Sequence, residues 1–336
     1  MDPENSTFLD ALTCRGVLLS VSVRYWRARR RLNPEDLGLK RDQVNPALIS
    51  LGHKRLLPRE SLERLALTAS RAHAVVDENT FPFLGGVARY LPNRRLQEVA
   101  ETLRGLRGEF EQRQEEFIGR YAVLRDAALR QWREAATALV DDPEALVAAV
   151  AAAFPPAEAM PRYFGFEIHT FQVTAPDVPQ AELVELGTRQ ELIQARREAA
   201  AAARREIEQS CRAFIAECAA TLRAETATLC GEMLQTIDGT GSVHQRTLNR
   251  LLKFIDHFRE LNFVNDTEMD RQLEDVRRQF LQHAAAEYRD SATARGALVG
   301  GLTALRAKAT ELAQADARHL VDSFGQMGRR RFTLAA

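Results

Sequence analysis

The sequence has no excess of charge of either sign and few cysteines. Lys and Arg together number 46, and Asp and Glu together also number 46, so the formal net charge is zero. This balance argues against a dedicated polyanion-binding protein, because the surface of such a protein usually carries a strong basic excess. The 336 residues include four cysteines and no Cys-x-x-Cys pair, so neither a disulfide framework nor a zinc module is expected.

Long apolar runs are also missing. The most apolar stretch, Ala145–Phe154, has ten residues, whereas a helix that crosses a bilayer takes roughly 20. We therefore expect a core helix there, no membrane partner and no membrane-perforating activity. The segment Met1–Ser6 is acidic and polar, unlike the basic and then apolar layout of a signal peptide. These features predict a soluble cytoplasmic protein with reduced cysteines.

The small numbers of proline (12) and glycine (18), together with long stretches rich in Ala, Arg, Glu, Leu and Gln, favour helix. From Leu96 to Leu139, apolar residues recur in steps of three and four for about six heptads, which is typical of a coiled-coil-like helix. If unbroken, a helix over 94–140 would be roughly 70 Å long. A second helical stretch is expected over 179–237, with a kink or break near Gly187. It is followed by a turn at Asp238–Ser242 and a returning helix.

Strand patterns are few. Residues 17–26 alternate over their second half, 163–173 are dense in aromatic and β-branched residues, 49–58 read as a loop with an extended piece, and 329–336 read as a terminal strand. We therefore predict a mainly α fold of long antiparallel coiled-coil-like helices with a small mixed α/β N-terminal unit. The predicted parts are a mixed unit over 1–93, a long helix over 94–142, a short helix and β-strand connector over 143–176, a long helical hairpin over 177–290, and a C-terminal helix with the terminal strand over 291–336.

No catalytic set stands out. A di-iron bundle needs two Glu-x-x-His motifs, and the chain has only Asp316–His319 in that sense and the reversed His257–Glu260. Solvated or capping histidines are the simpler interpretation. Asp238–Ser242 has no Lys and joins two predicted helices, so it is a hairpin turn rather than a phosphate-binding loop. No Gly-x-Ser-x-Gly or His-Glu-x-x-His motif is present. We expect a non-enzymatic protein with no cofactor and no metal.

Three cysteines fall on one predicted helix. Cys211 and Cys218 are seven residues apart, on one helix face, and Cys230 lies further along the same segment. They could be redox-active or bind metal. Their alignment with the apolar seam makes small core residues the simpler interpretation.

The arginine clusters are more informative. Five arginines lie within eight residues beside Tyr25 and Trp26, and three more lie near the C-terminus. Arginine with aromatic residues suits phosphates and stacked bases, and it equally suits an acidic protein face. The plain alternative is a solvated strand end. We also expect contacts from a non-helical surface in the first 93 residues, although Gly85–Gly86 could instead form a rigid turn around buried aromatics. The candidate partner- or nucleic-acid-binding residues are Arg24, Arg27, Arg29, Arg30, Arg31, His53, Lys54, Phe83, Tyr90, Arg329, Arg330 and Arg331.

Three segments carry a resemblance to a known family: Leu32–Leu39 (LNPEDLGL), Ile49–Pro58 (ISLGHKRLLP) and Phe81–Asn93 (FPFLGGVARYLPN). With the long helices that follow, the chain resembles a bacterial and phage family classed only as a domain of unknown function. The resemblance implies an origin on phages, plasmids or integrative conjugative elements. It also implies neighbouring genes for a MoxR-type AAA+ ATPase and a von Willebrand A-domain protein. No catalytic residue can be carried over from the family.

Two functions are therefore expected. The first is a non-enzymatic adaptor or scaffold of a mobile genetic element, which forms a homo-oligomer through its helices and works with the AAA+ ATPase and A-domain module. The alternative is a nucleic-acid-associated factor of a phage or conjugative element that uses the arginine clusters.

Overall fold

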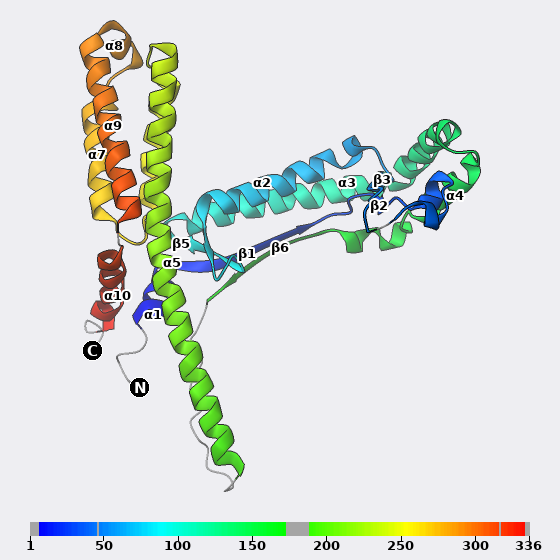
Figure 1. The fold of residues 1–336 in the computed structure, drawn as a ribbon, viewed down its shortest axis with the longest axis horizontal. Helices are drawn as coiled ribbons and strands as arrows, with labels where there is room; N and C mark the ends of the chain where they lie inside the picture. The colour runs from blue at the N-terminus through cyan, green and yellow to red at the C-terminus, as the bar shows by residue number, and fades with distance from the viewer. Residues whose placement is uncertain (1–6, 46, 173–187, 316, 333–336) are drawn as a thin grey trace. The chain divides into compact units, whose positions relative to one another are not determined.

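The computed structural model describes residues 7–45, 47–172, 188–315 and 317–332 (Figure 1). For residues 41, 188–193, 196 and 326–332 it describes the backbone alone. The chain divides into two compact units. Unit 1 is built from the described parts of Met1–Leu19, Asn79–Gln97 and Thr170–Ala336, and unit 2 from those of Ser20–Glu78 and Glu98–His169.

Helices dominate the described residues. They are α1 (Thr7–Arg15), α2 (Glu63–Asn79), α3 (Asn93–Leu139), α4 (Pro143–Ala152), α5 (Thr188–Thr240), α6 (Gln245–Leu261), α7 (Thr267–Phe280), α8 (Ala285–Asp290), α9 (Ala292–Gln314) and α10 (Arg318–Phe332). The strands are β1 (Gly16–Arg24), β2 (Arg29–Arg31), β3 (His53–Arg55), β4 (Phe81–Phe83), β5 (Ala88–Pro92) and β6 (Gly165–Phe171). The short 3-10 helices are η1 (Pro34–Leu37), η2 (Arg41–Gln43), η3 (Arg59–Leu62) and η4 (Ala157–Tyr163). None of the helices in these ranges combines the length and the apolar composition that a membrane crossing requires.

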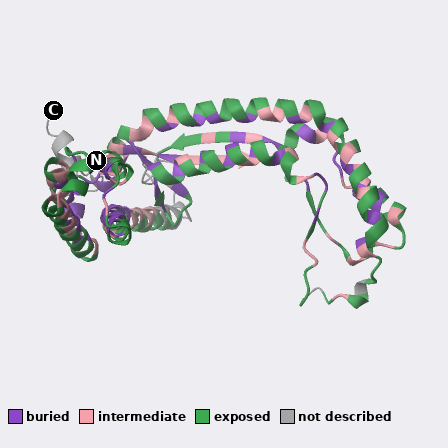
Figure 2. Cartoon of the chain, turned by 90° about the horizontal axis from the view of Figure 1, so that it is seen from above, coloured by how far each residue is buried: buried purple, intermediate pink, exposed green. Residues whose placement is uncertain are grey.

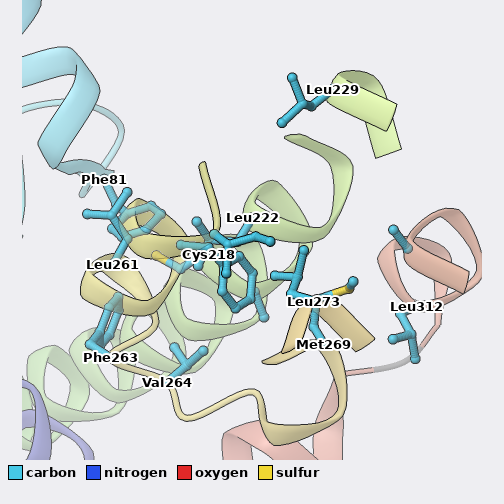
Figure 3. Packing of buried hydrophobic residues seen from close by; sticks show 14 of the residues in the cluster. Phe81, Cys218, Leu222, Leu229, Leu261, Phe263, Val264, Met269, Leu273 and Leu312 are labelled. Atoms are coloured by element: carbon cyan, nitrogen blue, oxygen red, sulfur yellow. The ribbon is translucent and has the colours of Figure 1, made fainter. Parts of the chain in front are cut away.

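The core of unit 1 forms around α5, which packs against α9, α10 and α1. Helix α6 buries one stripe at helical spacing, with Leu248, Leu251, Ile255 and Phe258 all nearly inaccessible to solvent. Such spacing places residues three and four apart on one face. Figure 3 shows the same cluster continuing through the buried residues of α7 and α9. The apolar stripes of these helices are therefore covered within the chain.

One small sheet has the strand order β4-β5-β1-β6. In unit 1, β5 pairs antiparallel with the start of β1, with Gly16 opposite Pro92, and antiparallel with β4, with Phe81 opposite Tyr90. The hydroxyl of Tyr90 donates a hydrogen bond to the Leu12 carbonyl oxygen at 2.8 Å. That bond satisfies the one polar atom of a ring that is otherwise buried.

Unit 2 has an aromatic core. The indole of Trp26 packs edge-on against Tyr121, with 5.7 Å between ring centroids, and tilted against Phe154 at 5.9 Å. Tyr121 donates from its hydroxyl to the Pro155 carbonyl oxygen at 2.6 Å. Figure 2 shows buried residues on one side of the long helices and exposed residues on the other. In unit 2, Phe117 and Tyr121 of α3 pack against Trp26.

The predicted mainly helical fold is confirmed, and its few strands include a small antiparallel sheet. The long helix expected over 94–140 is α3, and the strand expected over 163–173 is β6. Asp238–Ser242 does join two helices, α5 and α6. The break expected near Gly187 lies outside the described residues, and α5 is continuous from Thr188. Coiled-coil pairing stays a prediction.

The C-terminal expectation was wrong. Residues 329–332 belong to helix α10 rather than a strand, and 333–336 lie outside the described residues. Gly325 lies inside α10, where a Cβ would come within 2.6 Å of the Phe8 ring. The glycine allows α10 to approach α1 closely, so it serves packing and does not end the helix. The last helix is also divided in two, because Ala315 at the end of α9 has an extended backbone.

Candidate functional site

Two short strands of unit 2 form a ribbon made only of basic residues. Strand β2 pairs antiparallel with β3, so that Arg29 lies opposite Arg55, Arg30 opposite Lys54, and Arg31 opposite His53. Backbone hydrogen bonds extend the pairing at both ends, from the Leu32 N–H to the Gly52 carbonyl and from the Leu56 N–H to the Ala28 carbonyl. Like charges directly opposite each other destabilise a strand pair. We call β2 and β3 the basic ribbon.

One cation of the ribbon is neutralised inside the protein. Lys54 is buried, and its Nζ donates to Oδ1 of Asp36 at 2.5 Å, with both side chains less than 10% exposed. Asp36 belongs to η1, and its other oxygen accepts the backbone N–H of Asn33 at 2.8 Å. The ion pair therefore anchors the connection between β2 and β3, which contains η1, to strand β3. Removing one partner of such a pair costs about 3–5 kcal/mol, because the other charge is left buried.

A groove of about 610 Å³ adjoins the ribbon. Three segments of unit 2 form it: the chain from the end of β1 to β2, the chain from β3 into η3, and one face of α2. We call it the Arg groove. Its lining residues are Tyr25, Arg27, Arg29, Arg55, Leu57, Pro58, Arg59, Leu62, Glu63, Ala66, Leu67 and Ser70.

Side chains in this segment alternate between the core and the groove, which explains why arginines line the groove. Trp26 and Ala28 point into the core and are 6% and 1% exposed. Arg27, which lies between them, and Arg29, which follows, are exposed. Ala28 has a φ of 47°, in the left-handed region, which costs a non-glycine residue roughly 1–2 kcal/mol. The small buried side chain lets the chain turn there before β2 begins.

The charge of the Arg groove is one-sided. Four arginines line it, and Glu63 is the one carboxylate among its lining residues. Within the ranges that the structure describes, six exposed arginines of the ribbon and groove form no ion pair with a carboxylate. They are Arg27, Arg29, Arg30, Arg31, Arg55 and Arg59. The Arg27 guanidinium lies 6.0 Å from the centroid of the Tyr25 ring, a cation–π distance.

Arg24 differs from its neighbours. Its Nη2 donates to Oε1 of Glu167 on β6 at 2.7 Å. That hydrogen bond, together with a weaker one from His169, lowers the pKa of the Glu167 carboxyl below its usual value. Arg24 is therefore already paired and belongs to the sheet rather than to the groove.

The groove rests on the aromatic core. Trp132 of α3 donates from Nε1 to the carbonyl oxygen of Arg55 at 3.0 Å. The next residue along, Leu56, is completely buried. The backbone of β3 is thus held against α3 while the Arg55 side chain stays exposed, so the cationic lining lies on a rigid support.

The surface expected around His53, Lys54, Phe83 and Tyr90 was wrong in part. His53 is exposed, but Lys54, Phe83 and Tyr90 are buried. In unit 1, Phe83 packs edge-on against Phe214 at 4.9 Å between ring centroids. The alternative of a rigid turn around buried aromatics fits these positions. Leu84, Gly85 and Gly86 have φ values of 48°, 65° and 86°, which favour glycine.

The predicted residues Arg329, Arg330 and Arg331 follow one another on α10, and their side chains lie outside the description. In unit 1, Arg94 donates to the Arg259 carbonyl at 2.8 Å, and Arg95 forms an ion pair with Glu260 at 2.7 Å.

The described residues contain no cluster of three or more His, Cys, Asp or Glu side chains placed to hold a metal ion. Cys211, Cys218 and Cys230 are buried, as expected for core residues of the seam. Burial raises the pKa of the Cys211 thiol to about 11 and that of Cys230 to about 12, and it raises the pKa of Cys218 as well. Thiols with raised pKa values are poor nucleophiles at neutral pH.

Sequence reasoning missed several residues of this site. Arg55 was interpreted as part of the loop over 49–58, Arg59 as the start of the helix that follows, and Asp36 as part of a turn or helix start. Their roles depend on a strand register and on a pairing across 18 residues. The available signal was the basic segment 53–59, which contains no acidic residue and therefore resembles segment 24–31.

These features define a mainly helical protein of two units, one of which presents an arginine-lined groove beside a basic ribbon. The chain belongs to the family described as "Protein of unknown function (DUF3150)", whose family model matches residues 14–305. This agrees with the resemblance to a domain of unknown function seen in the sequence. Comparisons with the curated proteins and with the solved structures find no match.

Proposed function

We propose that this protein binds nucleic acid through the basic ribbon and the Arg groove. The observation that carries the proposal is the group of six exposed arginines that have no acidic partner in the described part of the chain. Arg29 and Arg55 even face each other across two strands. Such repulsion is relieved when an anion lies between the cations, and a phosphate backbone supplies a series of anions.

An acidic protein face would relieve the same repulsion. Nucleic acid is favoured because the cations surround a groove that also exposes aromatic and aliphatic surface, including Tyr25 and Leu67. Arginine beside aromatic rings suits phosphates and bases together. The overall charge balance of the chain does not oppose this proposal, since basic residues are concentrated in segments 24–31 and 53–59, which contain no acidic residue.

The test measures binding of a labelled oligonucleotide by fluorescence anisotropy between 50 and 200 mM salt. Binding should weaken steeply with salt. Changing Arg27, Arg29, Arg30 and Arg31 to Ala should remove most of the binding, and for duplex DNA it should reduce the salt slope by up to about 3.6.

The matched control removes the same charge from elsewhere in unit 2. Arg104, Arg107, Arg120 and Arg130 are exposed on α3, and changing all four to Ala should leave most of the binding intact. Absent or salt-insensitive binding of the unaltered protein would contradict the proposal. Equal losses of binding in the two quadruple variants would show only a general effect of charge.

As a second function we propose an adaptor role. The protein would form homo-oligomers and act with a MoxR-type AAA+ ATPase and a von Willebrand A-domain protein of a mobile genetic element. One feature supports a docking role: residues 197–202 of α5 are mostly exposed, and α5 buries its apolar residues from Cys211 onward. A helical stretch without packing is marginal in water, so a partner would stabilise it.

Coexpression with the neighbouring genes, followed by affinity purification, tests the adaptor role. We expect a stoichiometric complex with the ATPase or the A-domain protein. The double change Ala199→Arg and Ala202→Arg should weaken the complex, whereas Ala135→Arg, at an exposed position of α3, should not. Light scattering on the purified protein tests the homo-oligomer, and a monomer that ignores the ATPase would contradict this role.

A further inference from the structure

We infer that the Arg groove binds unpaired nucleotides, so that the protein recognises single-stranded nucleic acid rather than duplex. This inference rests on the proposed nucleic-acid binding and adds which form is bound. It comes from the combination of surfaces in the groove. Half of the twelve lining residues are apolar or aromatic, and one third are arginines.

The apolar part of the groove is accessible. Leu67 is 59% exposed, Tyr25 is half-buried, and Ala66 beside Leu67 is also half-buried. Leu57 and Leu62 are buried beneath them. Leu62 ends η3, and Ala66 and Ser70 follow at a step of four on α2, so these two share one face of that helix. An exposed apolar surface between cations is costly in water and suits a ligand that is itself both apolar and anionic.

A duplex does not have that character. Its base faces are stacked inside, and it offers phosphates together with the edges of the bases. A single strand exposes the base faces, which stack on aromatic and aliphatic side chains while arginines hold the backbone. Tyr25, with the Arg27 guanidinium near its ring, offers such a face beside a cation. The groove therefore offers a stacking surface for the base of an unpaired nucleotide and cations for its phosphate.

The charges of the groove also orient the strand. Arg29 and Arg55 lie on the ribbon side, whereas Glu63 lies in the first turn of α2. A phosphate near Glu63 would be repelled, so the backbone lies towards Arg29 and Arg55, and the bases contact Tyr25 and Leu67. The groove volume of about 610 Å³ is within the range of roughly 300–1,000 Å³ that encloses a small molecule. The groove thus takes a short piece of strand, about one or two nucleotides.

The experiment compares a labelled 12-nucleotide single strand, as DNA and as RNA, with the corresponding duplex at one salt concentration. The unaltered protein should bind the single strand at least tenfold more tightly. The variant Tyr25→Ala should weaken single-strand binding about tenfold, the typical loss when an aromatic stacking partner is removed. Leu67→Gln should weaken it as well, because the base loses an apolar contact. Neither variant should change duplex binding.

Two controls match these changes in exposure and chemistry. Leu139→Gln alters a leucine that is 56% exposed on α3, and Tyr163→Ala alters a tyrosine that is 40% exposed. Both should bind as the unaltered protein does. Leu67 is a surface residue, so its variant should fold normally, and circular dichroism checks this for all four variants.

A second readout reports stacking directly. An oligonucleotide that carries 2-aminopurine should change its fluorescence on binding, and Tyr25→Leu should abolish much of that change while phosphate contacts remain. Equal affinity for the two forms, with no effect of Tyr25 or Leu67, would overturn this inference and leave nucleic-acid binding standing. If neither form binds at all, the proposed function itself fails.

Discussion

Arg223 and Asp266 form a buried ion pair in unit 1. Nε of Arg223 donates to Oδ2 of Asp266 at 2.6 Å, and the two side chains are 1% and 2% exposed. Nη1 of the same guanidinium donates to the Leu312 carbonyl at the end of α9 at 2.8 Å. Asp266 also caps α7 by accepting the Met269 N–H. The pair thus fastens α5, α7 and α9 together.

Changing Asp266 to Ala should lower the free energy of unfolding by about 3–5 kcal/mol, because Arg223 would be left charged and buried. Urea titration followed by circular dichroism measures this. The control is Glu232→Ala, which breaks the exposed pair with Arg250 and should cost less than about 1 kcal/mol. Similar losses in the two variants would contradict the importance assigned to the buried pair.

Glycine at position 16 is required by close packing. A Cβ there would lie 2.5 Å from the Leu91 carbonyl oxygen and 2.7 Å from the Tyr90 hydroxyl. Gly16→Ala should therefore destabilise the protein by about 1–3 kcal/mol. Gly105 on α3 has no atom near the position of a Cβ, so Gly105→Ala should stabilise by about 0.5–1 kcal/mol. Thermal unfolding distinguishes the two, and a stabilised Gly16 variant would be inconsistent with the packing.

The buried thiols predict a loss of stability at alkaline pH. Folding raises the pKa of Cys211 to about 11 and of Cys230 to about 12 from 9.0, mainly through burial. A thiol whose pKa is higher in the folded than in the unfolded protein contributes its full stabilisation at a pH below its pKa in the unfolded protein. This contribution is lost as the pH rises through its pKa in the folded protein. Stability should therefore fall between about pH 9 and 12.

Urea titrations at pH 8 and pH 10.5 measure this loss. The loss should be smaller in Cys230→Ala than in the unaltered protein. Cys14 is exposed, and Cys14→Ala should show the full loss. If the two cysteine variants respond alike, ionisation of the buried thiol is not the cause.

The ion pair of Asp36 and Lys54 should support the groove without touching a ligand. Asp36→Ala leaves Lys54 charged and buried, which should cost unit 2 about 3–5 kcal/mol and weaken oligonucleotide binding. The double change Asp36→Leu with Lys54→Met should recover much of the stability and the binding, because it leaves no buried charge. Binding that stays lost in a stable double variant would mean that Lys54 itself contacts the ligand.

Long elements could be predicted from the sequence because their signal is local. The apolar repeat from Leu96 to Leu139 lies within α3, and the aromatic and β-branched residues of 163–173 predicted β6. The predicted C-terminal strand was wrong because 329–332 continue helix α10, whose Gly325 packs against Phe8 of α1 far away in the sequence. Local propensity gives way to such tertiary contacts.

The candidate site was only half predictable for the same reason. The clustering of Arg27 and Arg29 is visible in the sequence, and both line the groove. Arg55 and Arg59 join them through strand pairing, which no local pattern determines. Phe83 and Tyr90 looked like surface residues because glycine and proline surround them, yet both are buried in the core of unit 1.

Residues 25–29 alternate between the core and the Arg groove, so the lining of the groove depends on the number of residues in this segment. Side chains there alternate between the interior, at Trp26 and Ala28, and the groove, at Tyr25, Arg27 and Arg29. Exchanging one groove arginine for another side chain alters the surface and leaves the interior intact. Inserting or deleting one residue reverses the order, burying arginines and exposing the tryptophan. Relatives that fold in this way are therefore free to diverge by substitution in this segment, but not by a change of one residue in its length.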